Sequence, residues 1–172
     1  PKSDKIMVIG CLSEIMNNCP SAINSYFDEF FKVIMQHSGG TDGQMNRNCS
    51  YSIGILCQQA PEKFKQHLKQ AMDAVQLMHT KSDAADAKDN CVATLIRILD
   101  HYPTEFPEQV YNDLFNRVMS VVPFEADPTE NETVIKFCMN ANNLQAGRLE
   151  PHMEKITLTA LKILVDSRLV KD

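Results

Sequence analysis

The chain has 172 residues, of which 44% are apolar and 23% are charged, and its formal net charge at pH 7 is −5. This length and composition suit one packed domain or a short array of repeats, and they exclude a disordered tail, a collagen-like chain and a disulfide-dense mini-protein. Phosphate backbones are bound by clustered Lys and Arg, and no apolar run here is long enough to span a bilayer, so we expect neither nucleic acid nor a membrane among the partners.

Apolar residues recur at the spacing of an α-helix from one end of the chain to the other. No segment alternates between apolar and polar residues for long enough to predict a β-strand. We therefore predict an all-α fold. The expected helices span residues 4–18, 21–37, 44–59, 62–79, 83–101, 105–121, 128–143 and 150–169.

Prolines that end helices are the first sign of an internal repeat. Pro20, Pro61 and Pro103 each follow a helical stretch, and they stand 41 and 42 residues apart. A proline can start the next helix but cannot continue the previous one, so these positions divide the chain into helical segments at a regular interval.

Asparagines near the start of every second helix recur with the same period. Asn48, Asn90 and Asn131 stand 42 and 41 residues apart, and Cys49 and Cys91 follow the first two. Two independent markers with one period indicate a repeat of about 42 residues. A unit of about 40–47 residues with two helices is typical of HEAT and armadillo repeats, whereas TPR and ankyrin repeats are shorter.

The repeat predicts a right-handed α-α superhelix, a HEAT- or armadillo-type solenoid of about four antiparallel helix pairs. The repeats are placed at about residues 1–40, 41–81, 82–124 and 125–172. One helix pair cannot bury its own apolar face, so adjacent pairs stack into a continuous core. Because the sequence starts at Pro1 and without Met, we expect a single HEAT-repeat fragment of a longer solenoid protein, with apolar end faces that promote self-association.

The three recurring asparagines have a structural interpretation and a functional one. We expect the side-chain amides of Asn48, Asn90 and Asn131 to hydrogen-bond between adjacent repeats and so to form a structural ladder. A role of these amides in binding a partner is the alternative.

Residue types that carry catalysis or hold metals do not cluster in this sequence. The six cysteines form no C-x-x-C pair and no zinc-type group with histidine, which favours buried free thiols in a reducing compartment. These cysteines are Cys11, Cys19, Cys49, Cys57, Cys91 and Cys138. The sequence contains no G-x-G-x-x-G or P-loop motif and no local nucleophile–histidine pair. We therefore predict no enzyme, no cofactor and no metal site.

Acidic residues are concentrated in one part of the chain. From Ile98 to Glu132, eight acidic residues stand against one basic residue, Arg117. The acidic residues are Asp100, Glu105, Glu108, Asp113, Glu125, Asp127, Glu130 and Glu132. Two interpretations are open, a solvated face with acidic helix N-termini or a surface for a basic partner.

Three segments share more than the helical repeat with a known family. The motif RNCSYSIG begins the segment Arg47–Leu68, DNCVATLIRI begins Asp89–Pro103, and the turn VPFEAD lies within Val110–Phe137. Together these segments resemble the C-terminal part of karyopherin-β, or importin-β superfamily, receptors, and most closely their importin-β3-like branch. The resemblance extends over roughly residues 1–170, and Phe124 departs from it at a turn where the family often has Leu.

The resemblance implies a nuclear transport receptor that shuttles between cytoplasm and nucleus. Such receptors wrap cargo in the concave face of a long solenoid, release it when Ran-GTP binds, and cross the nuclear pore through weak contacts with Phe-Gly nucleoporins. Cargoes of this branch are basic, such as ribosomal proteins and histones. The main Ran contacts lie in upstream, N-terminal repeats of these receptors.

The resemblance also gives the acidic stretch a role in cargo binding. An acidic face attracts basic cargo through complementary charge, and such binding weakens as the salt concentration rises. We expect the cargo to contact Glu105, Glu108, Asp113, Glu125, Asp127, Glu130 and Glu132.

A static HEAT-repeat scaffold is the alternative function. Such a protein holds the partners of a complex together and transports nothing, and it shares every argument from periodicity given above. Binding of GTP-locked Ran to the full-length protein separates the two functions.

Overall fold

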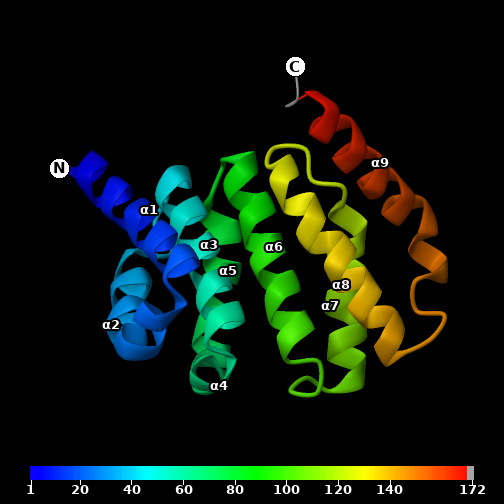
Figure 1. The fold of residues 1–172 in the computed structure, drawn as a ribbon, viewed down its shortest axis with the longest axis horizontal. Helices are drawn as coiled ribbons and strands as arrows, with labels where there is room; N and C mark the ends of the chain where they lie inside the picture. Colours follow the sequence, from blue (N-terminus) through cyan, green and yellow to red (C-terminus); the bar gives the residue numbers. More distant parts are fainter. Residues whose placement is uncertain (170–172) are drawn as a thin grey trace. The chain divides into compact units, whose positions relative to one another are not determined.

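The computed structural model describes residues 1–169, which form nine α-helices and three short 3₁₀-helices and contain no strand (Figure 1). The α-helices are α1 (Lys2–Asn18), α2 (Pro20–His37), α3 (Gly43–Gln59), α4 (Pro61–Phe64), α5 (Leu68–Lys81), α6 (Ala85–His101), α7 (Glu108–Val121), α8 (Asn131–Leu144) and α9 (Met153–Leu169). The 3₁₀-helices are η1 (Lys65–His67), η2 (Pro128–Glu130) and η3 (Glu150–His152). The predicted all-α fold class is confirmed.

Helix boundaries agree with the predicted ones except where a proline or a tighter turn intervenes. The predicted helix 62–79 is divided into α4, η1 and α5. The helix predicted from residue 105 begins at Glu108, because Pro107 before it has extended backbone angles (φ −52°, ψ 142°). The stretch that begins at Pro128 first forms the 3₁₀ turn η2 and becomes α-helical at Asn131.

Asp42 illustrates how a single side chain starts a helix here. Its carboxylate accepts a hydrogen bond from the backbone N–H of Met45 at 2.8 Å and so caps α3. A hydrogen bond from Lys2 and this backbone bond lower the pKa of the Asp42 carboxyl. The ionised carboxylate also places a negative charge at the N-terminus of α3, where the helix dipole favours it.

The helices form two compact units, residues 1–101 with α1 to α6 and residues 102–172 with α7 to α9. The boundary between the units falls within the third predicted repeat, 82–124. The four repeat boundaries given by the sequence period stay a prediction.

In the first unit, α3 is the central helix. It packs against α1, α2 and α6, while α5 packs against α6 (Figure 1). Its buried side chains point to more than one side of the helix and include Cys49, Ile53 and Leu56, each 0% exposed. A helix that is buried around most of its circumference lies inside a stack of helices.

Polar contacts between neighbouring helices of the first unit join residues about one predicted repeat apart. The hydroxyl groups of Ser13 in α1 and Ser52 in α3 lie 2.6 Å apart, across 39 residues of chain. The hydroxyl of Thr94 in α6 donates to the backbone carbonyl of Ser50 in α3 at 2.7 Å, across 44 residues. These separations bracket the period of about 42 residues that the sequence indicates.

A close approach of α3 and α6 explains Gly54. A Cβ atom at this position would lie 2.9 Å from Cδ of Arg97 and 3.3 Å from Oγ1 of Thr94. Glycine therefore leaves room for the Arg97 side chain, whose Nε donates to Oε1 of Gln58 at 3.2 Å.

An aromatic cluster in the first unit joins α2 to the segment formed by α4 and η1. Phe31 of α2 contacts Phe64 of α4 with ring centroids 6.3 Å apart, and its ring centroid lies 4.4 Å from that of His67 of η1. Phe64 is 0% exposed. Burial of this cluster fixes the short α4–η1 segment against α2.

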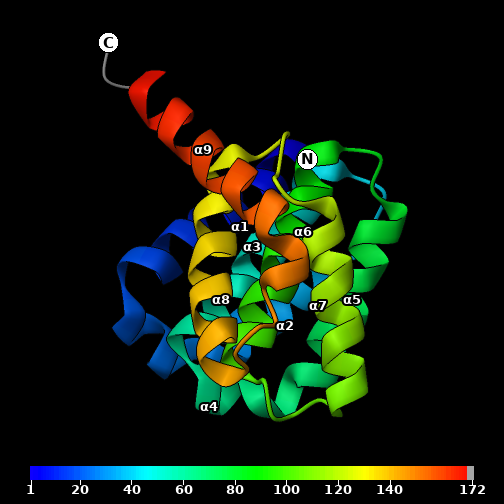
Figure 2. The same ribbon diagram turned by 90° about the vertical axis from the view of Figure 1, so that its right-hand side faces the viewer.

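In the second unit, aromatic side chains join α7 to the elements that follow it. The ring of Phe115 in α7 lies 5.4 Å from that of Phe137 in α8 and 5.6 Å from that of His152 in η3. Helix α9 packs against α8 (Figure 2). Phe124, in the turn after α7, is 1% exposed and fills the core of this unit.

The expectation that all six cysteines are buried is wrong for two of them. Cys11 and Cys19 are exposed, whereas the other four are buried and all six are free thiols. Cys11 lies on the outward face of α1, beside the exposed side chains of Met7, Val8 and Ile15. Because that face is apolar as well, the sequence pattern of α1 resembles that of a helix buried on two sides.

Helix α9 has a similar second apolar face. Its exposed apolar side chains include Leu158, Leu161, Leu164 and Val165, each about half exposed. The self-association expected from apolar faces at both ends stays a prediction.

Candidate functional site

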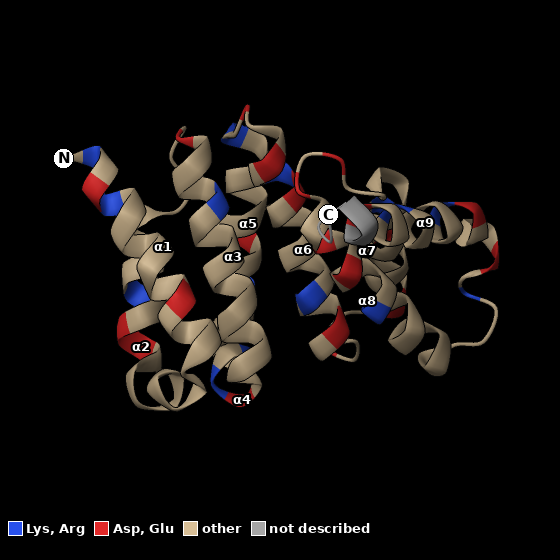
Figure 3. Cartoon of the chain, turned by 45° about the horizontal axis from the view of Figure 1, so that its top comes forward, with Lys and Arg blue, Asp and Glu red and all other residues tan. Residues whose placement is uncertain are grey.

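Five of the seven acidic residues expected to contact cargo lie at the surface of the second unit (acidic residues are red in Figure 3). They are Glu105 before α7, Glu108 and Asp113 on α7, Glu125 in the turn after α7, and Glu132 in the first turn of α8. Pro107 and the acidic Glu108 at the start of α7 suit a helix N-terminus, which favours negative charge. All five carboxylates are accessible to a partner.

Glu125 and Glu132 each have a lysine partner within the unit. Glu125 pairs with Lys162 of α9, and Glu132 lies 3.7 Å from the Nζ atom of Lys136 one helical turn away. Exposed ion pairs contribute about 0–1 kcal/mol, so a basic side chain of a partner can replace such a lysine at little cost.

The other two acidic residues, Asp127 and Glu130, are buried, at 6% and 5% exposure. The hydroxyl of Thr129 donates to the Asp127 carboxylate at 2.5 Å, and that of Thr133 donates to the Glu130 carboxylate at 3.0 Å. Both carboxylates thus hold the turn that leads into α8. The structure corrects the expectation for these two residues, because a buried carboxylate with partners of its own does not face a cargo protein.

The three recurring asparagines differ in their hydrogen-bond partners. Asn48 donates from Nδ2 to the carbonyl of Ile6 in α1 at 3.1 Å, across 42 residues. Asn90 donates to the carbonyl four residues earlier in its own helix at 3.0 Å. Asn131 is 0% exposed, accepts from the Phe124 N–H at 2.8 Å and donates to the Phe124 carbonyl at 3.0 Å. The bond of Asn48 has the form that the ladder requires, and the ladder as a whole stays a prediction.

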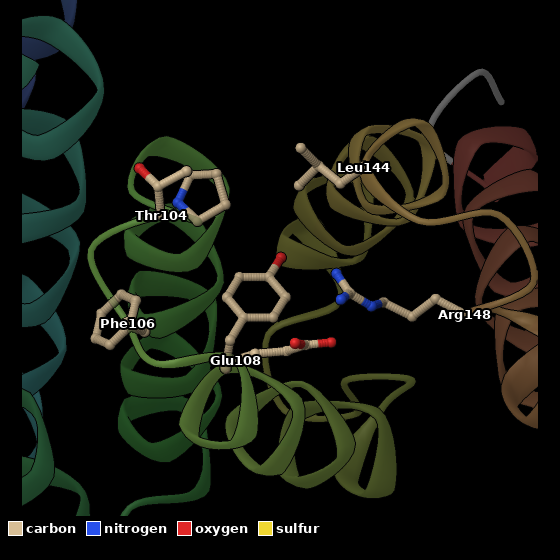
Figure 4. Close-up of a pocket in the computed structure, with 7 residues that line it drawn as sticks. Thr104, Phe106, Glu108, Leu144 and Arg148 are labelled. Atoms are coloured by element: carbon tan, nitrogen blue, oxygen red, sulfur yellow. The ribbon is translucent and has the colours of Figure 1, made fainter.

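A pocket of about 190 Å³ opens beside the first turn of α7 (Figure 4). Its lining residues are Pro103, Thr104, Phe106, Glu108, Tyr111, Leu144 and Arg148. The Arg148 side chain extends into the pocket from the loop after α8, and its guanidinium and the Glu108 carboxylate point toward the same space (Figure 4). The pocket combines one positive and one negative group with an apolar wall.

Arg148 is held on the aromatic side of this pocket. Its guanidinium carbon lies 4.8 Å from the ring centroid of Tyr111 and 5.8 Å from that of Phe115, which are cation–π distances. Its Nη2 atom donates to Oδ1 of Asn112 at 3.2 Å and to Oε1 of Gln145 at 2.5 Å. Both acceptors are neutral amides.

A wider groove of about 520 Å³ lies between α8 and the segment that leads into α9. Its lining residues are Ile135, Cys138, Met139, Asn142, Asn143, Gly147, Leu149, Glu150, Met153 and Ile156. Met139 and Met153 are 64% and 52% exposed. Exposed methionines adapt to apolar and aromatic side chains, so this groove suits the apolar side chain of a partner segment.

The buried thiols do not have the properties of catalytic nucleophiles. Burial raises the pKa of Cys49 and Cys57 to about 12 and that of Cys91 and Cys138 to about 11. Because the thiolate is the reactive form, these four side chains behave as small apolar groups at neutral pH.

Residues 1–169 lack two further features, a metal-type cluster and a helix of membrane-spanning character. Within this range, no group of His, Cys, Asp and Glu side chains has the arrangement needed to hold a metal ion. None of the helices in the same range combines the length and the hydropathy required to cross a membrane.

Sequence reasoning did not identify Arg148 as a site residue. Its aromatic partner Tyr111 lies 37 residues earlier, and neither residue belongs to a recognisable motif. A spacing close to one repeat between an arginine and a tyrosine is the signal that could have indicated the pair.

Comparisons with known proteins point to one family. No family model matches the chain, and no solved structure matches it. The chain is similar to the probable importin subunit beta-4 of Schizosaccharomyces pombe, with 22% identity over 166 residues. The match covers 96% of this chain and 15% of the fission-yeast protein. The similarity supports a relationship to the importin-β, or karyopherin, family.

Proposed function

We propose that this chain is a HEAT-repeat segment of a nuclear import receptor of the karyopherin-β family, within its importin-β3-like branch. The observation that carries the proposal is the similarity to an importin β subunit along 96% of the chain. The succession of packed helices α1, α3 and α6 supports it, because such stacking is typical of HEAT repeats. The segment acts by binding proteins and performs no enzymatic step.

Basic cargo proteins, such as ribosomal proteins and histones, are the proposed partners of the acidic surface. Glu105, Glu108 and Asp113 are exposed around the first half of α7, and Glu125 and Glu132 add two further exposed carboxylates in the same unit. Complementary charge increases the association rate and selects basic partners, and the effect decreases with ionic strength.

Phe-Gly nucleoporins are the proposed partners of the groove between α8 and α9. The exposed thioether groups of Met139 and Met153 and the side chains of Ile135 and Ile156 offer apolar contact to an aromatic ring. A shallow groove of this kind gives weak binding, which rapid passage through the nuclear pore requires.

Ran-GTP is proposed to control cargo release through upstream repeats of the receptor. The receptor then shuttles between cytoplasm and nucleus. The chain spans about 15% of the length of its fission-yeast relative, so this control belongs to the larger protein.

A static HEAT-repeat scaffold is the second candidate, because the stacked helices of the first unit suit either function. The test is a pull-down of the natural full-length polypeptide that contains this segment, with GTP-locked Ran as the bait. The transport function predicts that GTP-locked Ran binds the polypeptide and releases core histones from it. Histones that stay bound in the presence of GTP-locked Ran, with no Ran captured, would establish the scaffold instead.

A further inference from the structure

The side chains around Arg148 form a binding site that suits a guanidinium group. Tyr111 supplies an aromatic face at 4.8 Å, and Asn112 and Gln145 supply two acceptor oxygens for the Nη2 atom. Tyr111 is 3% exposed, so its ring is fixed by the core. A planar guanidinium uses a rigid aromatic face and paired acceptors better than a lysine ammonium does.

Arg148 satisfies its hydrogen-bond donors in this binding site only in part. Its Nε atom is buried and has no hydrogen-bond partner among the described residues. A buried donor without a partner loses its hydration with no compensating bond, which makes the binding of the Arg148 side chain in this site less favourable. The carboxylate of Glu108, the acidic residue of the pocket, points toward the space that the Arg148 guanidinium enters (Figure 4).

The loop that carries Arg148 contributes little to the core. Gln145 and Gly147 are exposed, and Gly147 has a positive φ of 83°, as expected of a turn residue without a side chain. Withdrawal of the Arg148 side chain uncovers the faces of the Tyr111 and Phe115 rings, and an incoming arginine covers them again.

We propose that the pocket lined by Glu108, Tyr111 and Leu144 is a binding site for an arginine side chain of a partner protein, and that Arg148 occupies this site from within the chain until the partner displaces it. The proposal rests on the proposed function only for the source of the arginine, a basic cargo. The incoming arginine stacks on Tyr111, takes over the bonds to Asn112 and gains the Glu108 carboxylate.

An intramolecular occupant reduces the apparent affinity of the site. A partner binds only the fraction of molecules in which Arg148 does not occupy the site. The apparent Kd therefore equals the intrinsic Kd divided by that fraction. Removal of Arg148 is therefore expected to strengthen binding of arginine. A residue that only maintains the fold would have the opposite effect or none.

The test measures fluorescence anisotropy of labelled peptides of four Gly-Arg or four Gly-Lys units with the full chain at low salt. For Arg148→Ala we expect about three- to tenfold tighter binding of the Gly-Arg peptide and a smaller gain for the Gly-Lys peptide. Glu108→Gln in the Arg148→Ala background should cancel the gain. Arg148→Gln keeps a donor for Asn112 and provides the same comparison if the alanine variant does not fold.

Arg117→Ala is the matched control, because Arg117 is an exposed arginine of α7 in the same unit and does not line the pocket. An equal gain in the control shows a net-charge effect and overturns the proposal, as does the absence of a gain in both Arg148 variants. If charge reversal of the acidic surface still abolishes histone binding in that case, only the arginine site is refuted. If it does not, the proposed cargo surface fails as well.

Discussion

The two units of the molecule use their polar side chains differently. In residues 1–101, buried hydroxyl groups bond α1 to α3 and α3 to α6, as between Ser13 and Ser52 and between Thr94 and Ser50. In the second unit, the bonds from α7 to later segments involve larger polar groups at or near the surface, as between His152 and Asn116 at 3.0 Å. The first unit thus joins its helices through buried hydroxyl groups, whereas the polar contacts of α7 with later segments lie near the surface. The buried polar groups of the second unit, such as Asn131, bond within the turn before α8.

The largest expected change in the free energy of unfolding comes from the aromatic core of the first unit. Phe64→Ala removes a ring that is 0% exposed and should lower the free energy of unfolding by about 3–5 kcal/mol. Phe106→Ala in the second unit alters a half-buried ring that lines a pocket and should cost about 1 kcal/mol. Urea denaturation of the two variants measures the difference, and equal losses would show that the burial of a ring does not determine its contribution to stability.

The hydroxyl bonds of the first unit provide the next test. Thr94→Val leaves the Ser50 carbonyl without its side-chain donor inside the core and should lower the free energy of unfolding by about 1–3 kcal/mol. Thr157→Val is the control, since the Thr157 hydroxyl bonds to a carbonyl of its own exposed helix at 2.8 Å. We expect a change within about 0.5 kcal/mol there. Equal melting temperatures for the two variants would show that the buried bond contributes nothing.

A carboxylate introduced in the groove of the second unit should weaken binding of a Phe-Gly peptide, whereas one introduced in the first unit should not. Met139→Asp and Met153→Asp place carboxylates in the apolar groove and should weaken binding of a Phe-Gly repeat peptide about tenfold. Met7→Asp in α1 adds the same charge at an equally exposed methionine and should leave the affinity unchanged. Surface plasmon resonance compares the three variants, and an equal loss for Met7→Asp would remove the groove from the proposed function.

Alkaline pH should destabilise the first unit more than the second through the buried thiols. Burial raises the pKa of Cys49 and Cys57 from 9.0 to about 12, so their stabilising effect is complete below pH 9 and is lost as the pH rises toward 12. In Cys49→Ala/Cys57→Ala, the urea midpoint should fall less between pH 8 and pH 10 than in the parent chain. Cys138→Ala should reduce the fall less, and Cys11→Ser, at an exposed thiol, should leave it unchanged. A double variant with an undiminished fall would contradict this explanation.

The sequence predicts the helices well because their apolar stripes are long and prolines mark their ends. The period of about 42 residues agrees with the bond between Asn48 and Ile6, which joins residues 42 apart. The division of one predicted helix at η1 was not predictable, because residues 65–67 contain no glycine or proline. A tighter turn in such a segment results from tertiary packing rather than from a local sequence signal.

The sequence does not distinguish the buried acidic residues of the candidate surface from the exposed ones. Asp127 and Glu130 stand in the same acidic stretch as Glu125 and Glu132, yet the first two are buried and the last two are exposed. The difference arises from the fold of the turn before α8, where nearby threonine hydroxyls bond the buried carboxylates. Charge patterning alone cannot show which carboxylates a turn encloses.

The site at Arg148 depends on contacts that no local pattern reveals. Its partner Tyr111 is an ordinary apolar position of the α7 stripe, and Gln145 is one of several polar residues after α8. Only the fold brings the arginine, the ring and the two amides together.

The central claim is that the exposed acids of the second unit bind basic cargo, and its most direct test is the affinity for core histones at low and at physiological salt. The test variant is Glu105→Lys/Glu108→Lys/Asp113→Lys, and the control variant is Glu14→Lys/Asp28→Lys/Glu29→Lys, with the same charge change on exposed residues of the first unit. The account predicts that the test variant loses most of its affinity at low salt, while the control retains most of it. An unchanged affinity in the test variant, or an equal loss in the control, would contradict it.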